Sequence, residues 1–250
     1  MRATTLLAIL LPIMLQQPVR VLGCLQARAE TSNSGTGPAE QFPYPIMGSD
    51  NPADSATTGY FINHLAITVR NLTRSIDFYS TAFGLRLMFT LRVSKHISIS
   101  YMGHSHGGRN GTGYQTAIEI NRQKNNIEGL IELLHVDVPK FALTSSTKVP
   151  NTFGHIGVVV PDIKATQARL EKLGAKILKG HGEESTRDGR QKGIANASGL
   201  SDDIVAQLDQ AEIDAVTALL NIQNKPLIFL EDPDGNLIEV QNQEGSQLVN

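Results

Sequence analysis

The pattern of hydrophobic and polar positions in this chain repeats twice. In the first copy, residues 61–69 form a β-rich run that contains a histidine, residues 72–83 keep helical spacing, and Gly84 follows. The second copy has the same order, with residues 153–160, residues 163–173 and Gly174. Apolar positions at helical spacing, closed by a glycine suited to a C-cap, predict an amphipathic helix after each strand.

Each copy ends in a short apolar strand that contains one glutamate. These strands are residues 130–133 with Glu132, and residues 237–240 with Glu239. The sequence Asp-Pro-Asp-Gly at residues 232–235 is a strong turn signal, so the last strand is predicted to be the far arm of a hairpin. Two copies of strand, helix and strands predict an α+β fold of two similar modules, module 1 (residues 60–139) and module 2 (residues 153–242).

Module 2 carries an insertion at about residues 196–224. Its apolar positions over residues 201–222 have broadly helical spacing, and Ser201 before two aspartates is typical of a helix start. We therefore expect a helical insertion that caps one side of the domain. The insertion could serve as a structural lid or as a surface that binds a partner, and the sequence does not choose between these roles.

The N-terminal residues have the pattern of a secretory signal peptide, predicted over residues 1–27. Arg2 precedes an apolar run over residues 6–15 that is too short to cross a bilayer comfortably. An uncleaved membrane anchor and a lipoprotein signal ending at Cys24 are the alternatives. Residues 28–59, rich in Ser, Gly, Thr and Pro, are predicted to be a flexible leader. We expect a secreted protein with no membrane association after signal cleavage.

Composition narrows the classes of partner. A formal net charge of −2 gives no reason to expect nucleic acid or an anionic membrane, which leaves small molecules or a protein partner. The single cysteine lies in or beside the signal, so no disulfide is expected in the mature domain. Three sequons, at Asn71, Asn110 and Asn196, are candidate glycosylation sites and support export.

The repeated histidines and glutamates predict a metal site. A glutamate in an apolar strand is costly to bury unless it is paired or binds a cation. A lone strand histidine or glutamate is usually an ordinary core or surface residue, but here both occur twice at equivalent positions. We expect His64, Glu132, His155 and Glu239 to converge on one divalent ion, because imidazole and carboxylate suit Zn²⁺, Ni²⁺ and similar metals. Zn²⁺ and Ni²⁺ are the first expectations.

These motifs together resemble the glyoxalase I (lactoylglutathione lyase) group of the vicinal oxygen chelate superfamily. The resemblance covers about residues 60–242 without the insertion, and rests on segments that occur in the family's order. They are the His64 strand, residues 75–79, residues 83–85, residues 131–133, residues 153–157, residues 232–235 and residues 238–239. It implies paired βαβββ modules that form a cupped mixed sheet around one metal, with the same four residues as ligands.

The activity that the resemblance implies is isomerisation of the hemithioacetal of a 2-oxoaldehyde and glutathione to a 2-hydroxyacyl thioester. Glu239 is then the first candidate for the carboxylate that moves the proton, and Glu132 the second. The basic loop at residues 188–195 implies that Arg190 and Lys192 bind the substrate. A homodimer and a single chain could each assemble such a site.

The sequence departs from the family where it would anchor glutathione. In the family, an arginine, an asparagine and a second arginine anchor glutathione. The corresponding positions in this sequence hold Thr68, Val136 and Asn151. Loss of charged anchors weakens glutathione binding, since a charge-assisted hydrogen bond contributes about 1.5–3 kcal/mol. A metalloenzyme of the same fold that acts on another small oxygenated metabolite is therefore an alternative, and a ligand-binding protein without catalysis is another.

Overall fold

The computed structural model describes residues 46–107, 113–140 and 142–243. The predicted signal peptide and Asn110 lie outside these ranges. Of the predicted leader, residues 46–59 are described: they are exposed and contain one 3₁₀ turn, η1 (Ser55–Thr57). Within the described ranges, no helix has the length and apolar character needed to cross a membrane.

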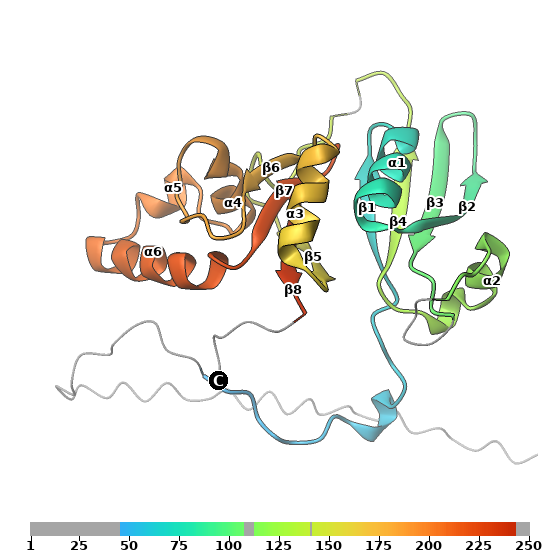
Figure 1. Ribbon diagram of the computed structural model, residues 1–250, viewed down its shortest axis with the longest axis horizontal. Helices are drawn as coiled ribbons and strands as arrows, with labels where there is room; N and C mark the ends of the chain where they lie inside the picture. The colour runs from blue at the N-terminus through green and yellow to red at the C-terminus, as the bar shows by residue number, and fades with distance from the viewer. Residues whose placement is uncertain (1–45, 108–112, 141, 244–250) are drawn as a thin grey trace, which may run out of the picture. The chain divides into compact units, whose positions relative to one another are not determined.

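Module 1 is one four-stranded mixed sheet with two helices (Figure 1). Its sheet order is β1-β4-β3-β2, with β1 and β4 parallel and the other neighbours antiparallel. Its elements are β1 (His64–Val69), α1 (Leu72–Phe83), β2 (Arg86–Arg92), β3 (Ile97–Gly103), α2 (Ala117–Arg122), η3 (Lys124–Asn126) and β4 (Leu130–Val136). Helix α2, which begins with a capping box formed by Thr116 and Glu119, is an addition that the repeat did not predict.

Module 2 repeats this plan with the sheet order β5-β8-β7-β6. Its shared elements are β5 (His155–Val160), α3 (Ile163–Lys172), β6 (Lys176–Lys179), β7 (Ile228–Glu231) and β8 (Leu237–Asn242). Strands β5 and β8 are parallel, and residues 232–235 join β7 to β8 as the predicted hairpin. The two sheets confirm the α+β fold of paired βαβββ modules.

The first helix of each module has the predicted position because the sequence marks both of its ends. The side chain of Asn71 accepts a hydrogen bond from the backbone N–H of Arg74 at the start of α1, and Gly84 ends it in the left-handed conformation at φ 74°. Asp162 caps α3 through the N–H of Ala165. Each cap side chain thus pairs one of the N–H groups that the first turn of a helix leaves without an intrahelical partner.

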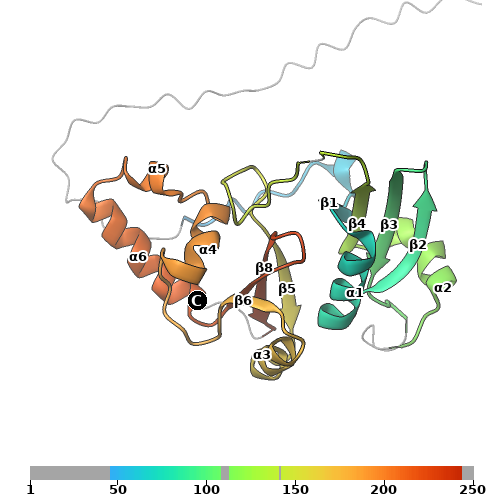
Figure 2. The same cartoon turned by 90° about the horizontal axis from the view of Figure 1, so that it is seen from above.

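The two faces of each sheet are covered by different helices. On one face, Tyr79 of α1 and Leu170 of α3 belong to a single apolar core with alternate strand residues of both sheets, including Val69 and Ile238. On the opposite face, α2 packs on the module 1 sheet and α4 (Lys192–Ala197) packs on Phe229 and Leu237 of module 2. Figure 2 shows α3 and α4 on different sides of β8.

The insertion is helical, as predicted, but it begins earlier and is divided. It consists of η4 (Gly189–Gln191), α4, α5 (Asp202–Val205) and α6 (Gln210–Asn224). The break falls at Asp209, whose side chain caps α6 in a capping box with Glu212. The spacing Asp-x-x-Glu is the sequence signal that divides residues 201–222 into two helices.

Lys179 holds the two ends of the insertion together. Its buried ammonium group donates hydrogen bonds to the carbonyls of Gly180, Asn224 and Leu227, at 3.1, 2.7 and 3.2 Å. Burial lowers the pKa of Lys179 from 10.5 to about 8. The end of β6 and the end of α6 are thus fixed side by side, where the β6–β7 pairing has a register shift between Ile177 and Lys179.

Candidate metal centre formed by paired histidines and glutamates

Each module brings its histidine and its glutamate into contact. His64 Nε2 lies 3.3 Å from Glu132 Oε2, and His155 Nε2 lies 3.5 Å from Glu239 Oε2. We name these the module 1 pair and the module 2 pair. The histidine side chains are 34% and 42% exposed and the glutamates 16% and 20%, so both pairs are partly desolvated yet reachable from solvent.

The strand register explains why the same contact forms twice. Ala66 lies beside Glu132 in the β1–β4 ladder, and Gly157 lies beside Glu239 in the β5–β8 ladder. Strand side chains alternate, so each histidine, two residues before the small residue, shares its face and can reach the glutamate. This face is opposite to α1 and α3, because neighbouring residues such as Ile67 and Ile238 point into the core.

His64 is oriented by the side chain before it. Asn63 Nδ2 donates to the carbonyls of Lys124 (2.8 Å) and Ile127 (2.6 Å), so its Oδ1 is turned to His64 Nδ1 at 2.8 Å. Because Oδ1 can only accept, Nδ1 of His64 carries a proton. In neutral His64 the lone pair is then on Nε2, the atom that faces Glu132. An imidazole nitrogen and a carboxylate oxygen directed at one point fit a divalent metal ion.

Tyr101 of β3 lies against the module 1 pair. Its hydroxyl is 3.4 Å from His64 Nε2, its ring meets the His64 ring edge-on at 5.3 Å, and Glu132 is its partner in the β3–β4 ladder. Burial and the neighbouring Glu132 carboxylate raise the pKa of Tyr101, so the phenol stays protonated at neutral pH. Sequence reasoning missed Tyr101 and Asn63; only the position of Asn63 directly before His64 could have suggested a role.

The module 2 pair has different neighbours. Gly154 precedes His155, and the ladder partner of Glu239 is Phe229. Among the described residues, no side chain outside the pair forms a hydrogen bond with His155 or Glu239. Phe229 is instead buried under α4 with Leu237. The two pairs therefore match in backbone position and differ in polar support.

The predicted four ligands are found as two pairs. In the part of the chain that the structure describes, no three side chains of His, Cys, Asp or Glu gather closely enough to hold one metal ion. Convergence of the two pairs on one ion stays a prediction. Each pair alone supplies one nitrogen and one oxygen donor, which is half of a four-coordinate site.

The predicted substrate residues lie on the insertion side of module 2. Arg190 pairs with Glu183 at 2.5 Å and Lys192 pairs with Asp202 at 2.5 Å. Both cations line a cavity of about 380 Å³, together with Lys148 and other residues. The cavity is rich in positive charge, but Arg190 and Lys192 would have to exchange exposed ion pairs for a ligand, a change that costs little.

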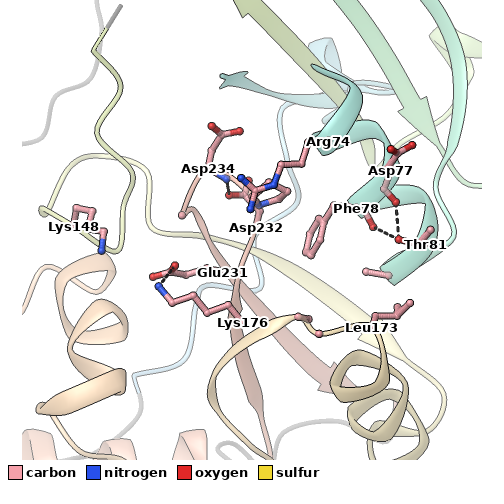
Figure 3. A pocket seen from close by; sticks show the side chains of 15 residues that line it. Arg74, Asp77, Phe78, Thr81, Lys148, Leu173, Lys176, Glu231, Asp232 and Asp234 are labelled. Carbon is pink, nitrogen blue, oxygen red and sulfur yellow. Dashed lines mark hydrogen bonds and ion pairs between the residues drawn. The ribbon is translucent and has the colours of Figure 1, made fainter. Parts of the chain in front are cut away.

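A larger cavity lies away from the paired ligands (Figure 3). It has a volume of about 540 Å³, and none of the four predicted ligands lines it. Its lining includes Phe78 of α1, the Lys176–Glu231 ion pair and Asp232. Here Asp232 accepts a hydrogen bond from the hydroxyl of Tyr79 at 3.0 Å, a buried contact between the modules. Residues of both modules line this cavity, and it is separate from the candidate metal centre.

A third cavity borders His64. Its volume is about 370 Å³, and its lining is mostly apolar, with residues of β1, β4 and β5 such as Leu65, Leu130 and Val158. An apolar space of this size beside a few polar groups is typical of a small-molecule site.

The sequence profile of the Glyoxalase/Bleomycin resistance protein/Dioxygenase superfamily matches residues 61–240. The chain belongs to this superfamily. The match includes both modules, all four predicted ligands and the insertion.

The chain is similar to several curated glyoxalases. It is 25% identical to lactoylglutathione lyase of Schizosaccharomyces pombe over 186 residues, which are 71% of this chain and 57% of that protein. It is 28% identical to lactoylglutathione lyase of Pseudomonas aeruginosa over 130 residues, which are 50% of this chain and 72% of that protein. The match thus spans little more than half of the fission yeast protein.

Among solved structures, the chain is similar to the trypanothione-dependent glyoxalase I of Leishmania major. The two share 20% sequence identity and a TM-score of 0.40, over 74% of this chain and 88% of that one. Glyoxalase I of Zea mays matches at 17% identity and a TM-score of 0.41, covering 72% and 43%.

Proposed function

We propose that this protein is a glyoxalase I-like, metal-dependent lyase that converts the hemithioacetal of a 2-oxoaldehyde and a thiol to a 2-hydroxyacyl thioester. The observation that carries the proposal is the duplicated contact between a histidine nitrogen and a glutamate oxygen, at 3.3 and 3.5 Å and at equivalent register. The superfamily and the similarity to lactoylglutathione lyases support this chemistry over others.

The four ligands would hold one divalent ion, with Zn²⁺ or Ni²⁺ as the first candidates. When bound, such an ion supplies a Lewis acid that polarises the oxygens of the substrate. Glu239 takes the proton from the carbon that bears the sulfur and delivers it to the neighbouring carbonyl carbon, and Glu132 is the alternate for this role. The partly exposed Glu239 side chain has the access to solvent and substrate that a proton carrier needs.

This chain departs most from the family at the positions that would bind the thiol part of the substrate. Thr68 and Val136 carry no charge, and the Asn151 side chain is engaged with the backbone of Val149 and Phe153. Arg190 and Lys192 of the cation-rich cavity are the candidate anchors that remain. This favours, as the second candidate function, a metalloenzyme of the same fold that acts on another small oxygenated metabolite; a ligand-binding protein without catalysis is the third.

Two arrangements would bring the pairs to one ion. The modules of a single chain could close on each other, or two chains could associate so that module 1 of one faces module 2 of its partner. Sedimentation of the protein with and without Zn²⁺ separates these arrangements. A monomer that binds one ion supports closure, and a metal-free monomer that becomes a dimer with two ions when Zn²⁺ is added supports exchange between chains.

The first test is metal binding. We expect the full chain, stripped of metal and dialysed against Zn²⁺, to retain one ion per chain, and His155→Ala to lose it because a ligand is removed. His96→Ala, which replaces an exposed histidine, is the matched control and should bind as wild type does. A wild-type protein that retains no metal, or a His155→Ala variant that binds normally, contradicts the proposed site.

Turnover is the second part of the same test. Conversion of methylglyoxal–glutathione hemithioacetal by the metal-loaded protein supports the lyase. Metal binding without turnover of this or other hemithioacetals would favour the second candidate function.

We also propose secretion, with Asn71 as the glycosylated residue among the described sequons. Asn71 is exposed and caps α1 through its oxygen, which leaves Nδ2 available for a glycan. Asn196 is 8% exposed, and its Nδ2 donates to the carbonyls of Thr147 and Lys148, so the folded structure does not favour a glycan there. In a eukaryotic secretory host, Asn71→Gln should remove one glycan and Asn196→Gln should remove none, as read by mass spectrometry. A glycan on Asn196 would count against this assignment.

A further inference from the structure

The two halves of the candidate metal centre differ in how their ligands are held. In module 1, Asn63 fixes His64 at 2.8 Å, and the Tyr101 hydroxyl lies 3.4 Å from His64 Nε2, with Glu132 as the ladder partner of Tyr101. In module 2, the corresponding positions are occupied by Gly154 and Phe229, which have no polar side chain. The duplication kept the ligands but placed orienting groups around only one pair.

The Tyr101 ring is itself held firmly. It is 8% exposed, stacked on Phe89 with ring centroids 5.3 Å apart, and covered by the ammonium group of Lys124 at 4.0 Å from its centroid. A cation over a ring and a second ring in contact both restrict rotation and displacement. The hydroxyl is therefore presented to the His64–Glu132 pair in one place.

We infer that Tyr101, together with Asn63, is a positioning residue that makes the module 1 pair the fixed anchor of the metal centre. Groups that hydrogen-bond to metal ligands set their orientation and commonly contribute 10–100-fold in metal affinity. His64 and Glu132 therefore have orienting groups beside them that the module 2 pair lacks. The inference rests on the proposed function, since it assigns unequal roles within that site.

The test compares Zn²⁺ affinity among variants of the full chain, by competition with a chelating dye. Tyr101→Phe removes one oxygen and keeps the ring, and we expect Zn²⁺ binding about tenfold weaker than wild type. Tyr114→Phe is the matched control, since it removes a phenol hydroxyl from a tyrosine that is 74% exposed, and should leave affinity unchanged. Wild-type affinity in Tyr101→Phe overturns the inference.

Two further comparisons separate positioning from general structural support. Glu132→Gln should weaken Zn²⁺ binding more than Glu239→Gln does, and equal or reversed losses overturn the inference. In the Glu132→Gln background, Tyr101→Phe should have little further effect, because the hydroxyl acts through the His64–Glu132 pair that this variant already disrupts. A full additional loss there would also overturn it. If the wild-type protein binds no Zn²⁺, the proposed function itself fails. Failure of the inference alone would instead appear as normal Zn²⁺ binding by both wild type and Tyr101→Phe.

Discussion

Glu239→Gln should reduce turnover of a hemithioacetal substrate by about 10³-fold. A positioned carboxylate that carries a proton contributes on the order of 10²–10⁴ to rate, and glutamine cannot take up that proton. Since Gln retains a carbonyl oxygen and Glu132 anchors the ion, bound Zn²⁺ should persist in the variant. The measurement is steady-state thioester formation by metal-loaded protein, with metal content determined on the same sample.

The matched control is Glu171→Gln on α3. Glu171 is exposed in the same module and accepts a hydrogen bond from Gln167, so its loss should leave turnover within twofold of wild type, as expected for a surface change of about 0.5 kcal/mol or less. A Glu239→Gln variant that retains metal and full activity would remove Glu239 from its proposed role and direct attention to Glu132.

Asp232→Ala should lower the free energy of unfolding by about 3–5 kcal/mol. Asp232 is 5% exposed and accepts four hydrogen bonds, from the Tyr79 hydroxyl and from the backbone or side chain of Asp234 and Asn236. Alanine leaves these donors without a partner, and each unsatisfied buried group costs about 1–3 kcal/mol. Urea unfolding followed by circular dichroism measures the change.

Two companion variants sharpen this prediction. Asp203→Ala replaces an exposed aspartate of the insertion and should change stability by less than about 0.5 kcal/mol. Tyr79→Phe removes only the hydrogen bond from Tyr79 to Asp232, so it should cost less than Asp232→Ala but more than the control. Equal stability of Asp232→Ala and wild type would mean that neither the hairpin turn nor the contact between the modules depends on this carboxylate.

The local signals in the sequence located most of the secondary structure. Helix α1 followed from the apolar spacing and Gly84, and the β7–β8 hairpin followed from its turn sequence, because caps and turns depend on residues close together in the chain. The N-cap at Asn71 was not predicted. The sequence also contains the capping boxes that begin α2 and α6. The repeat and the apolar spacing alone predict neither helix α2 nor the break in the insertion.

The sequence by itself determined the two modules and the pairing of one histidine with one glutamate in each. The repeated spacing places the histidine and the glutamate at equivalent positions of the two modules, and the registers of β1 with β4 and of β5 with β8 bring each pair into contact. Only the tertiary structure showed Asn63 and Tyr101 at the module 1 pair, and Gly154 and Phe229 at the other. Tyr101 reaches Glu132 through the register of β3 with β4, and such long-range pairing is decided by packing of the whole sheet.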